Sequence, residues 1–339
     1  MKITVLAYLE ADATEPDVVV PQVAEVLRGA GHDVSSVTVR DDVRQLVHDL
    51  RGQQPDLVFN LLESFGDDIV GGQMGVCGLL DLLQLPYTGG GPGELYLQED
   101  KALAKKLLSY EGVLYPDFAS FAANADFETG GKLRMPLFVK PARSDASIGI
   151  DAEKSLVRNT QELLQQVSDL HQKFGGAVLA EEYIEGRELY IGVLGNQEPL
   201  VFPPVEMDFS DLPDGMAKVM DNKAKFDTSS EQYHGTKAVI PELPAELKAK
   251  LQKVALAAYR ALRVRDYGRI DLRLTESGEI YVIEANANCY LERNSEYAMA
   301  AAAAEIDYPT LIERITQAAL QRQSKAEVRS QKSEVPSDF

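Results

Sequence analysis

Cysteines and basic side chains are scarce in this 339-residue sequence, and each scarcity argues against a class of protein. The two cysteines, Cys77 and Cys289, form neither a CxxC pair nor a disulfide framework. Lysine and arginine number 34 against 53 aspartate and glutamate residues, for a formal net charge of −19 and a pI of about 4.7. Without a basic stripe, we expect no nucleic-acid partner and no membrane partner, and any phosphate binding must be local.

Three further patterns are missing. No apolar run approaches the roughly 20 residues that span a bilayer. The chain begins directly with the strand-like stretch Lys2-Ile-Thr-Val-Leu6 rather than with a signal peptide, so we expect a cytoplasmic protein. The first strand is not followed by GxGxxG, the glycine pattern of a Rossmann domain, so a dinucleotide site has no support.

The sequence does contain enough hydrophobic residues, 45%, to bury cores in two or three subdomains. Strand and helix patterns alternate over about the first 95 residues. This alternation predicts a parallel sheet with helices packed on it. The strands are expected at 2–7, 32–39 and 56–60, and the helices at 16–30, 40–52 and 72–83.

A second unit follows a helix at 100–111 and a connector over 115–131. Its strand at 136–143 carries Lys140 near the end and leads into the small, polar loop 144–149. Such a loop can bring backbone N–H groups close to a phosphate while the lysine supplies a point charge. This stretch is therefore a candidate phosphate site.

The later part of the chain alternates between periodic and irregular stretches. Residues 207–237 show little periodicity, and a loop of this length is uncommon in a compact domain unless it is functional or disordered. After about Ser324 the chain is rich in Lys, Glu, Ser and Gln, which predicts a disordered tail. Regular structure is expected as strands at 177–188 and 189–206 and as helices at 244–264 and 307–321.

Two alternating runs, 269–274 and 279–286, are joined by Ser277-Gly278 and predict a β-hairpin with a two-residue turn. In that register one face is apolar, with Leu272 opposite Ile283 and Leu274 opposite Tyr281.

On the other face of this hairpin, Asp271 lies opposite Glu284 and Arg269 opposite Asn286. Directly opposed Cβ atoms lie about 4.5–5.5 Å apart, where like charges are destabilising unless a cation lies between them. Two carboxylates and an amide oxygen suit Mg²⁺, a hard ion with oxygen ligands. For this pair alone, a surface hairpin with both carboxylates in solvent is the alternative.

Five motifs follow one another along the chain: Lys140 at a strand end, Glu181-Glu-Tyr-Ile184, the pair Lys225-Phe226, Arg269-Ile-Asp271 and Glu284-Ala-Asn286. Their order resembles that of the ATP-grasp superfamily, and within it the D-alanine–D-alanine ligases, in which the lysine of the third motif belongs to a lid. The resemblance covers roughly residues 1–321. It implies a mixed α/β (α+β) ATP-grasp fold with an N-terminal parallel-sheet subdomain. The units would be 1–95, a central subdomain 96–185, a C-terminal subdomain 186–321 with the metal site, and a tail 322–339.

The same resemblance implies ATP and Mg²⁺ (or Mn²⁺) as cofactors and assigns roles around the nucleotide. Lysines would contact the phosphates, namely Lys101, Lys140 and Lys225. The adenine would be read by Glu181, Glu182, Tyr183 and Ile184, and the ribose hydroxyls would be held by Glu188. The metal ligands would be Asp271, Glu284 and Asn286.

For the reaction itself, the resemblance makes Arg269 the group that stabilises negative charge on the intermediates. Ser147 would belong to the phosphate loop that closes over ATP, and Ser295 would bind the carboxylate of the second substrate. The ammonium of the first substrate would be held by Glu10 or Glu15, and the sequence leaves that choice open.

Several positions depart from the ligase pattern. Ala146 replaces the first of two adjacent serines, and Phe226 replaces a lid tyrosine, so a hydroxyl-to-hydroxyl tie is absent on both sides. Cys289-Tyr290 stands in place of Pro-Gly, and the Tyr290 side chain could enter the substrate pocket.

Two further departures introduce acidic groups. Glu63 replaces a histidine and Glu296 an apolar residue, and both would repel a second carboxylate and favour a cationic or amino group.

The resulting hypothesis is an ATP-dependent, ADP-forming ligase that joins the carboxylate of an amino acid or small acid to an amine through an acyl phosphate. An ATP-binding regulatory or scaffold protein without ligation, and a peptide-extending ligase, are the alternatives. The resemblance also suggests a homodimer through the first subdomain. The identity and stereochemistry of the acid and amine stay open.

Overall fold

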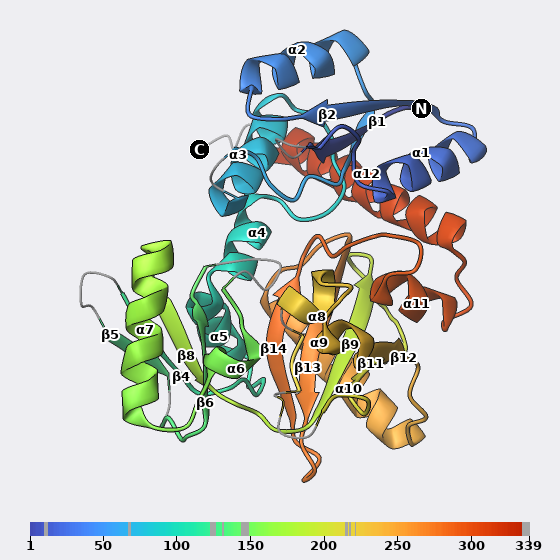
Figure 1. Cartoon of the computed structure of the whole chain (residues 1–339). Coiled ribbons are helices and arrows are strands. Elements are labelled where there is room, and N and C mark those ends of the chain that lie inside the picture. Colours follow the sequence, from blue (N-terminus) through green and yellow to red (C-terminus); the bar gives the residue numbers. More distant parts are fainter. Residues whose placement is uncertain are drawn as a thin grey trace, which may run out of the picture.

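The computed structural model describes residues 1–9, 13–66, 69–122, 127–130, 132–143, 149–213, 216, 218–220 and 222–333. Three β-sheets organise these residues, a small one in the N-terminal part and two larger ones side by side below it (Figure 1). The fold is mixed α and β, as expected from the sequence.

The N-terminal sheet is parallel and has the order β2-β1-β3. Each strand contains a run of β-branched or aromatic residues, and helices cover both faces because parallel sheets are buried on both sides. The expected alternation of strands and helices is confirmed. The strands are β1 (Lys2–Tyr8), β2 (Asp33–Val39) and β3 (Leu57–Asn60), and the helices α1 (Val19–Gly29), α2 (Val43–Gln53) and α3 (Ile69–Leu82).

The second sheet is antiparallel and has the order β5-β4-β8-β6-β7. It consists of β4 (Phe118–Phe121), β5 (Phe127–Gly130), β6 (Leu137–Pro141), β7 (Leu156–Val157) and β8 (Val178–Glu182). Its helices are α6 (Ala152–Ser155) and α7 (Thr160–Phe174), and α4 (Pro92–Glu99) and α5 (Lys101–Tyr110) lead into it.

The expected connector over 115–131 is wrong, because it contains strands β4 and β5. The side chains of Phe118 and Ala119 in β4 are buried. Phe118, on β4, packs with Leu179 of β8 in a small cluster of its own. Tertiary packing therefore gives this segment the regular structure that its short sequence pattern does not show.

The third sheet has the order β12-β11-β9-β13-β14, with β10 paired to β9. Its strands are β9 (Arg187–Leu194), β10 (Leu200–Val201), β11 (Val205–Asp208), β12 (Lys237–Val239), β13 (Tyr267–Leu274) and β14 (Ile280–Asn286). The helix α10 (Ala245–Ala261) covers one face of this sheet (Figure 1). The expected loop 207–237 contains two short helices, α8 (Asn222–Phe226) and α9 (Glu231–His234).

The hairpin β13–β14 has the expected pairing on its charged face, with Arg269 opposite Asn286 and Asp271 opposite Glu284. Its apolar pairing was predicted wrongly, because Leu272 faces Val282 and Leu274 faces Ile280. The turn is one residue longer than expected. Thr275 pairs with Glu279 around a three-residue loop that ends at Gly278, whose φ is +84°.

A β-bulge between Asp271 and Leu272 compensates for this longer turn. On β14 the extra residue is Ile283, which lies between Val282 and Glu284 in the register. A bulge shifts the pairing by one residue, so it restores at Asp271 the register that the turn had displaced. The charged pairs were therefore predicted correctly although two assumptions behind them were not.

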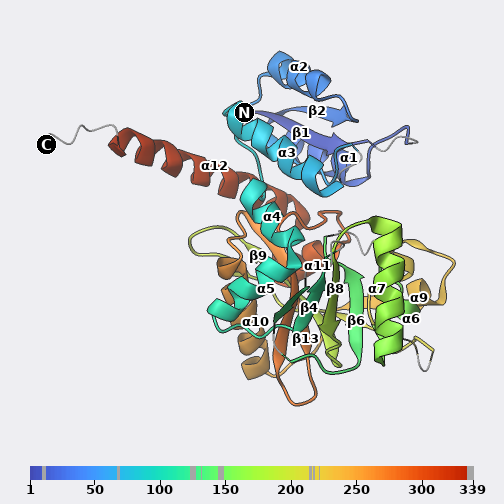
Figure 2. The same ribbon diagram turned by 90° about the vertical axis from the view of Figure 1, so that its left-hand side faces the viewer.

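The last helices are α11 (Glu296–Ala302) and α12 (Tyr308–Ser333), and α12 extends away from the sheets at its end (Figure 2). The disordered tail expected from residue 322 is wrong over its first part, because α12 continues to Ser333. Arg322 is anchored there. Its guanidinium donates to Asp266 at 2.8 Å and to the Tyr87 carbonyl oxygen at 2.7 Å.

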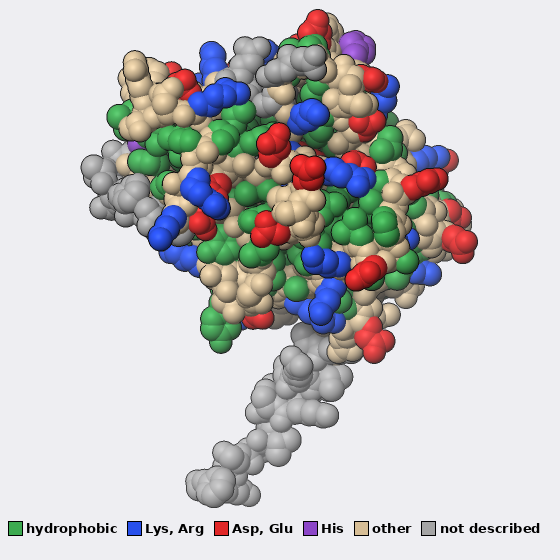
Figure 3. Space-filling model, turned by 90° about the horizontal axis from the view of Figure 1, so that it is seen from below, with side chains coloured by type: hydrophobic (Ala, Val, Ile, Leu, Met, Phe, Trp, Pro, Cys, Tyr) green, Lys and Arg blue, Asp and Glu red, His purple; other side chains and the backbone are tan. Residues whose placement is uncertain are grey.

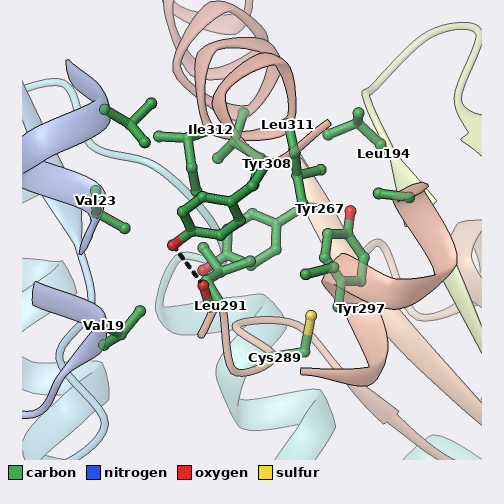
Figure 4. Close-up of a cluster of buried hydrophobic side chains, with 14 of the residues drawn as sticks. Val19, Val23, Leu194, Tyr267, Cys289, Leu291, Tyr297, Tyr308, Leu311 and Ile312 are labelled. Carbon is green, nitrogen blue, oxygen red and sulfur yellow. Dashed lines mark hydrogen bonds between the residues drawn. The ribbon is translucent and has the colours of Figure 1, made fainter. Parts of the chain in front are cut away.

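One large hydrophobic core joins the N-terminal sheet to the helix α12. Figure 4 shows Val19 and Val23 of α1 facing Leu311 and Ile312 of α12 across Tyr308. The Tyr308 hydroxyl donates a hydrogen bond of 2.8 Å to the Leu291 carbonyl oxygen. The N-terminal sheet therefore shares its core with the C-terminal helix.

No helix in the described part of the chain has the length and apolar character needed to cross a membrane. On the face shown in Figure 3, lysine and arginine side chains are interspersed with aspartate and glutamate rather than gathered in one patch. This mixture agrees with the acidic composition of the whole chain.

Candidate active site

A cleft lies between the second and third sheets. Along β13, alternate residues point to opposite faces, so Ile270, Leu272 and Leu274 join the core beneath α10 while Asp271 and Arg273 face the cleft. The lining comes from both sheets and from α8. It includes Lys101, Phe138, Lys140, Glu181, Glu182, Tyr183, Ile184, Glu188, Tyr190, Lys225, Asp271, Arg273, Ile283, Glu284 and Asn286.

A buried carboxylate between two lysines forms the wall on the side of the second sheet. Lys140 of β6 donates to Glu181 of β8, which lies diagonally across the antiparallel pair, opposite Phe138. Lys105 of α5 lies 3.0 Å from the other oxygen of Glu181, as an ion pair without hydrogen-bond alignment. Burial would raise the pKa of Glu181, but Lys105 and Lys140 outweigh it and lower that pKa to about 2. Glu181 is therefore a carboxylate near neutral pH. Burial would lower the pKa of Lys140, but the charges of Glu181 and Glu284 raise it, whereas burial lowers the pKa of Lys105.

The segment after β8 passes along the cleft as an extended stretch. Glu182 is buried and accepts hydrogen bonds from the backbone N–H of Arg134 at 2.7 Å and from its guanidinium at 2.9 Å. The backbone N–H of Tyr183 donates to the Pro136 carbonyl oxygen at 3.0 Å. These bonds fix the path of the segment, and Tyr183 and Ile184 line the cleft.

Glu188 lies at the start of β9 and is held by two donors. Arg273 donates to one carboxylate oxygen at 2.5 Å, and the Tyr190 hydroxyl donates to the other at 2.7 Å. The Arg273 guanidinium also lies over the Tyr183 ring, 5.7 Å from its centre. The orientation of Glu188 toward the cleft is thus set by side chains of two neighbouring strands.

The opposed carboxylates of Asp271 and Glu284 lie on the face of the third sheet that lines the cleft, on the edge strand β14 and its neighbour β13. Burial, with a smaller contribution from Glu284 and Glu188, raises the pKa of Asp271 to about 6, against the effect of Arg269. Burial would likewise raise the pKa of Glu284, but Lys101, Lys140 and Lys225 together lower it.

Asn286 completes the expected metal set and donates to Asp271 at 3.1 Å. Among the described residues, no three His, Cys, Asp or Glu side chains gather as a metal centre. Two carboxylates and an amide nevertheless fit Mg²⁺, which is usually bound by one or two carboxylates together with substrate phosphates and water. The carboxylate of Glu284 forms no hydrogen bond or ion pair with the described residues, so its oxygens are available to such an ion.

Arg269 lies on β13 beside this pair. Its Nε and Nη2 donate to the two oxygens of Asp271 at 2.7 and 2.9 Å. Burial would lower the pKa of Arg269, but the adjoining Asp271 carboxylate raises it. Arg269 is therefore a permanent cation next to the metal set.

Of the expected substrate residues, Glu296 lies 3.5 Å from Arg269, whereas three others lie away from this cleft. Glu15, Glu63 and Tyr290 line a second cavity of about 310 Å³, at the carboxyl ends of β1 and β3 in the N-terminal sheet. The Tyr290 hydroxyl donates to Asp17 at 2.8 Å. Ser295 is buried and caps α11 by accepting from the Ala298 N–H at 3.3 Å.

The family model for the D-Ala-D-Ala ligase C-terminus matches residues 106–317, which contain the lining of the cleft apart from Lys101. The chain belongs to the D-alanine–D-alanine ligase family. A D-alanine–D-alanine ligase of Desulforudis audaxviator is 31% identical over 88% of this chain and 92% of its own length. The uncharacterized protein y4sG of Sinorhizobium fredii is 34% identical over 78% of this chain and 75% of its own.

The fold of this ligase-family chain is shared with solved structures. The D-alanine–D-alanine ligase of Bacillus anthracis complexed with ATP matches with a TM-score of 0.71 and 22% identity, covering 96% of this chain and 99% of that one. The family expected from the sequence is confirmed, and with it the ATP-grasp fold, ATP and Mg²⁺ as cofactors, and an ADP-forming ligase that makes a peptide bond. A nucleotide-binding scaffold without ligation is not favoured.

Some of the residues expected from the ligase resemblance cannot be placed. Ser147, Ala146 and Glu10 lie outside the described residues, as does the side chain of Phe226. The lid helix α8 is described, and its Lys225 lines the cleft.

Several residues of this ligase site were missed in the sequence. Lys105 falls four residues after Lys101 on α5, a spacing that places both on one helix face, but a lysine in that pattern is usually solvated. Arg273 and Tyr190 share the alternation of their strands with Asp271 and Glu188. That period-2 pattern was the signal that could have identified them.

Proposed function

We propose that this protein activates the carboxylate of D-alanine or a similar small amino acid with ATP and joins it to the amine of a second amino acid. The observation that carries the proposal is the single cleft in which three cationic side chains, Lys101, Lys140 and Lys225, face the Asp271–Glu284 pair. Such a cleft suits a triphosphate bound together with a divalent cation.

The nucleotide roles follow from the positions in the cleft. Lys101, Lys140 and Lys225 would neutralise phosphate charge, and the stretch Glu181–Ile184 would hold the adenine. Glu188 would accept hydrogen bonds from the ribose hydroxyls. Its orientation by Arg273 and Tyr190 supports this role, because a pre-oriented carboxylate binds two hydroxyls without further ordering.

Asp271, Glu284 and Asn286 would hold Mg²⁺, which supplies charge neutralisation at the transferred phosphoryl group. Asn286 and Arg269 both donate hydrogen bonds to Asp271, and this clustering supports a cation site beside the Asp271 carboxylate. These residues keep the carboxylates aligned on one face of the sheet.

The chemistry requires a carboxylate to become an electrophile. Phosphorylation gives an acyl phosphate and ADP, the amine attacks the acyl carbon, and phosphate leaves as the amide bond forms. Arg269 would stabilise the negative charge that develops in both steps, with Ser147 assisting at the phosphate loop. The fixed position of Arg269 beside Asp271 supports the role of Arg269.

The substrate side would be formed by Glu15 and Glu63 for an ammonium group, by Ser295 for a carboxylate, and by Phe226, Tyr290 and Glu296 as the side chains that shape the pocket. The cavity lined by Glu15, Glu63 and Tyr290 supports the binding of an ammonium group by Glu15 and Glu63, because these two carboxylates line it.

At the level of the whole molecule, we infer subdomains at 1–95, 96–185 and 186–321 around this cleft. We further infer a cytoplasmic homodimer without a nucleic-acid partner, acting on small-molecule substrates. The acidic net charge of −19 supports the absence of nucleic acid.

The test is ADP release with ATP and Mg²⁺ over a panel of D- and L-amino acids, singly and in pairs, with the product identified by mass spectrometry. Turnover with D-alanine and an amino-acid acceptor is expected. Confirmed ATP binding without ADP release for every pair would overturn the proposal.

A further inference from the structure

The guanidinium of Arg269 is held on more sides than its pairing with Asp271 explains. Its Nη1 lies 3.5 Å from Glu296 Oε2, and its plane lies over the ring of Tyr190, 4.3 Å from the ring centre. Tyr190 is itself fixed by its hydroxyl bond to Glu188. Each nitrogen of the guanidinium therefore lies against a carboxylate, and its face lies against an aromatic ring.

The backbone of α11 fixes the place from which Glu296 makes this contact. Glu296 is the first residue of α11, directly after the cap Ser295. A negative charge in the first turn of a helix is favoured by the helix dipole and by the unpaired N–H groups there. The side chain is also partly shielded from solvent, which strengthens its attraction to Arg269.

Three described residues contact the Arg269 guanidinium and restrain it in different ways. Both oxygens of Asp271 bind Arg269, yet Asp271 is also a proposed metal ligand, so its hold on the arginine is shared. Stacking on Tyr190 restrains the guanidinium plane but leaves rotation within that plane free. Glu296 is the described carboxylate at the opposite edge, and it can resist that rotation.

We propose that Glu296 is a positioning residue that, together with Tyr190, keeps Arg269 directed at the reacting group while Asp271 serves the cation. This inference rests on the proposed function for the role of Arg269 in the reaction. In this proposal Glu296 orients Arg269, whereas the sequence alone predicts that Glu296 favours a cationic acceptor.

The kinetic test compares Glu296→Gln and Glu296→Leu with the control Glu305→Gln, an exposed glutamate just beyond the same helix. We expect kcat to fall about 10- to 100-fold in Glu296→Leu, less in Glu296→Gln, and not in the control. The KM for ATP should change less than about twofold, and neutral and basic acceptors should lose rate equally. A loss confined to the KM of basic acceptors would instead make Glu296 a substrate-selecting residue.

A second measurement does not depend on catalysis. In the wild-type protein with Mg²⁺ and ADP added, NMR of ¹⁵N-labelled arginine should show slow rotation of the Arg269 guanidinium, and Glu296→Leu should make this rotation fast with the fold intact. Unchanged rotation would overturn the positioning role. If the wild-type protein forms no product, the proposed function fails, and the NMR comparison still decides whether Glu296 holds Arg269.

Discussion

The two halves of the candidate site are built in different ways. The nucleotide half lies between two sheets, and its charged groups are buried in pairs, as in Lys140–Glu181 and Arg269–Asp271. The substrate half lies beside the N-terminal sheet, where Glu15, Glu63 and Tyr290 are exposed.

This difference has an energetic meaning. A buried ion pair is expensive to break, because the remaining charge has no water to replace its partner. An exposed hydrogen bond exchanges with water at little cost. The nucleotide half is thus expected to be rigid and intolerant of change, whereas the substrate half can be altered without loss of the fold.

The largest effect should come from Asp271→Asn, which removes a carboxylate at the centre of the nucleotide half. We expect ADP formation to fall at least about 100-fold, because charge at the phosphoryl group is no longer neutralised. The measurement is initial-rate ADP release, with thermal melting to show that the fold is intact. Glu276→Gln, in the exposed turn of the same hairpin, is the control, and a wild-type rate in Asp271→Asn would mean that the metal is placed wrongly.

The next largest effect concerns stability. Glu181→Gln leaves Lys105 and Lys140 buried without their shared counter-ion, so the free energy of unfolding should fall by about 3–5 kcal/mol. Urea denaturation checks this. The matched control Asp211→Asn breaks the exposed pair with Lys237 and should cost less than about 1 kcal/mol. Equal losses in the two variants would remove the contrast between buried and exposed pairs.

Glu181 also predicts a dependence of stability on pH. Its pKa is about 2 in the folded protein against 4.5 for the ordinary group, so its carboxylate stabilises the fold fully above pH 4.5. That contribution, about 3 kcal/mol, should be lost as the pH falls from about 4.5 through about 2. Unfolding free energies of the wild type and Glu181→Gln should therefore converge over this window, and parallel curves would contradict the low pKa.

The smallest effect is expected in the substrate half. Tyr290→Phe removes the hydrogen bond to Asp17. Because this bond is exposed, its loss should weaken binding of the acid by about 1 kcal/mol or less. The KM for the acid should therefore rise less than about tenfold. Tyr110→Phe, on the exposed side of α5, is the control. A large loss of kcat in Tyr290→Phe would show that this half is as rigid as the other.

The parts of the fold that were predictable are those with a strong period. The alternation of β13 and β14 placed Arg269, Asp271, Glu284 and Asn286 on one face, and the structure has that face. Hydrophobic alternation specifies which side of a sheet a residue takes, since a one-residue slip would move these charged groups into the apolar core beneath α10.

The parts that were not predictable depend on contacts distant in the sequence. Lys105 lies on α5, and its buried position follows from Glu181, some 76 residues later, so no local pattern reveals it. The bulge at Ile283 and the three-residue turn at Gly278 are single-residue events that leave the period-2 pattern nearly unchanged. Phe118 was placed in a connector because its strand is four residues long.

The core shared by α1 and α12 has a consequence for the order of synthesis. The apolar side chains of β1 and α1 emerge first from the ribosome, but their partners Leu311, Ile312 and Ile315 emerge near the end. The side of α1 that packs on α12 therefore stays uncovered until α12 has been synthesised. Completion of the first unit is thus tied to synthesis of a helix that lies far along the chain.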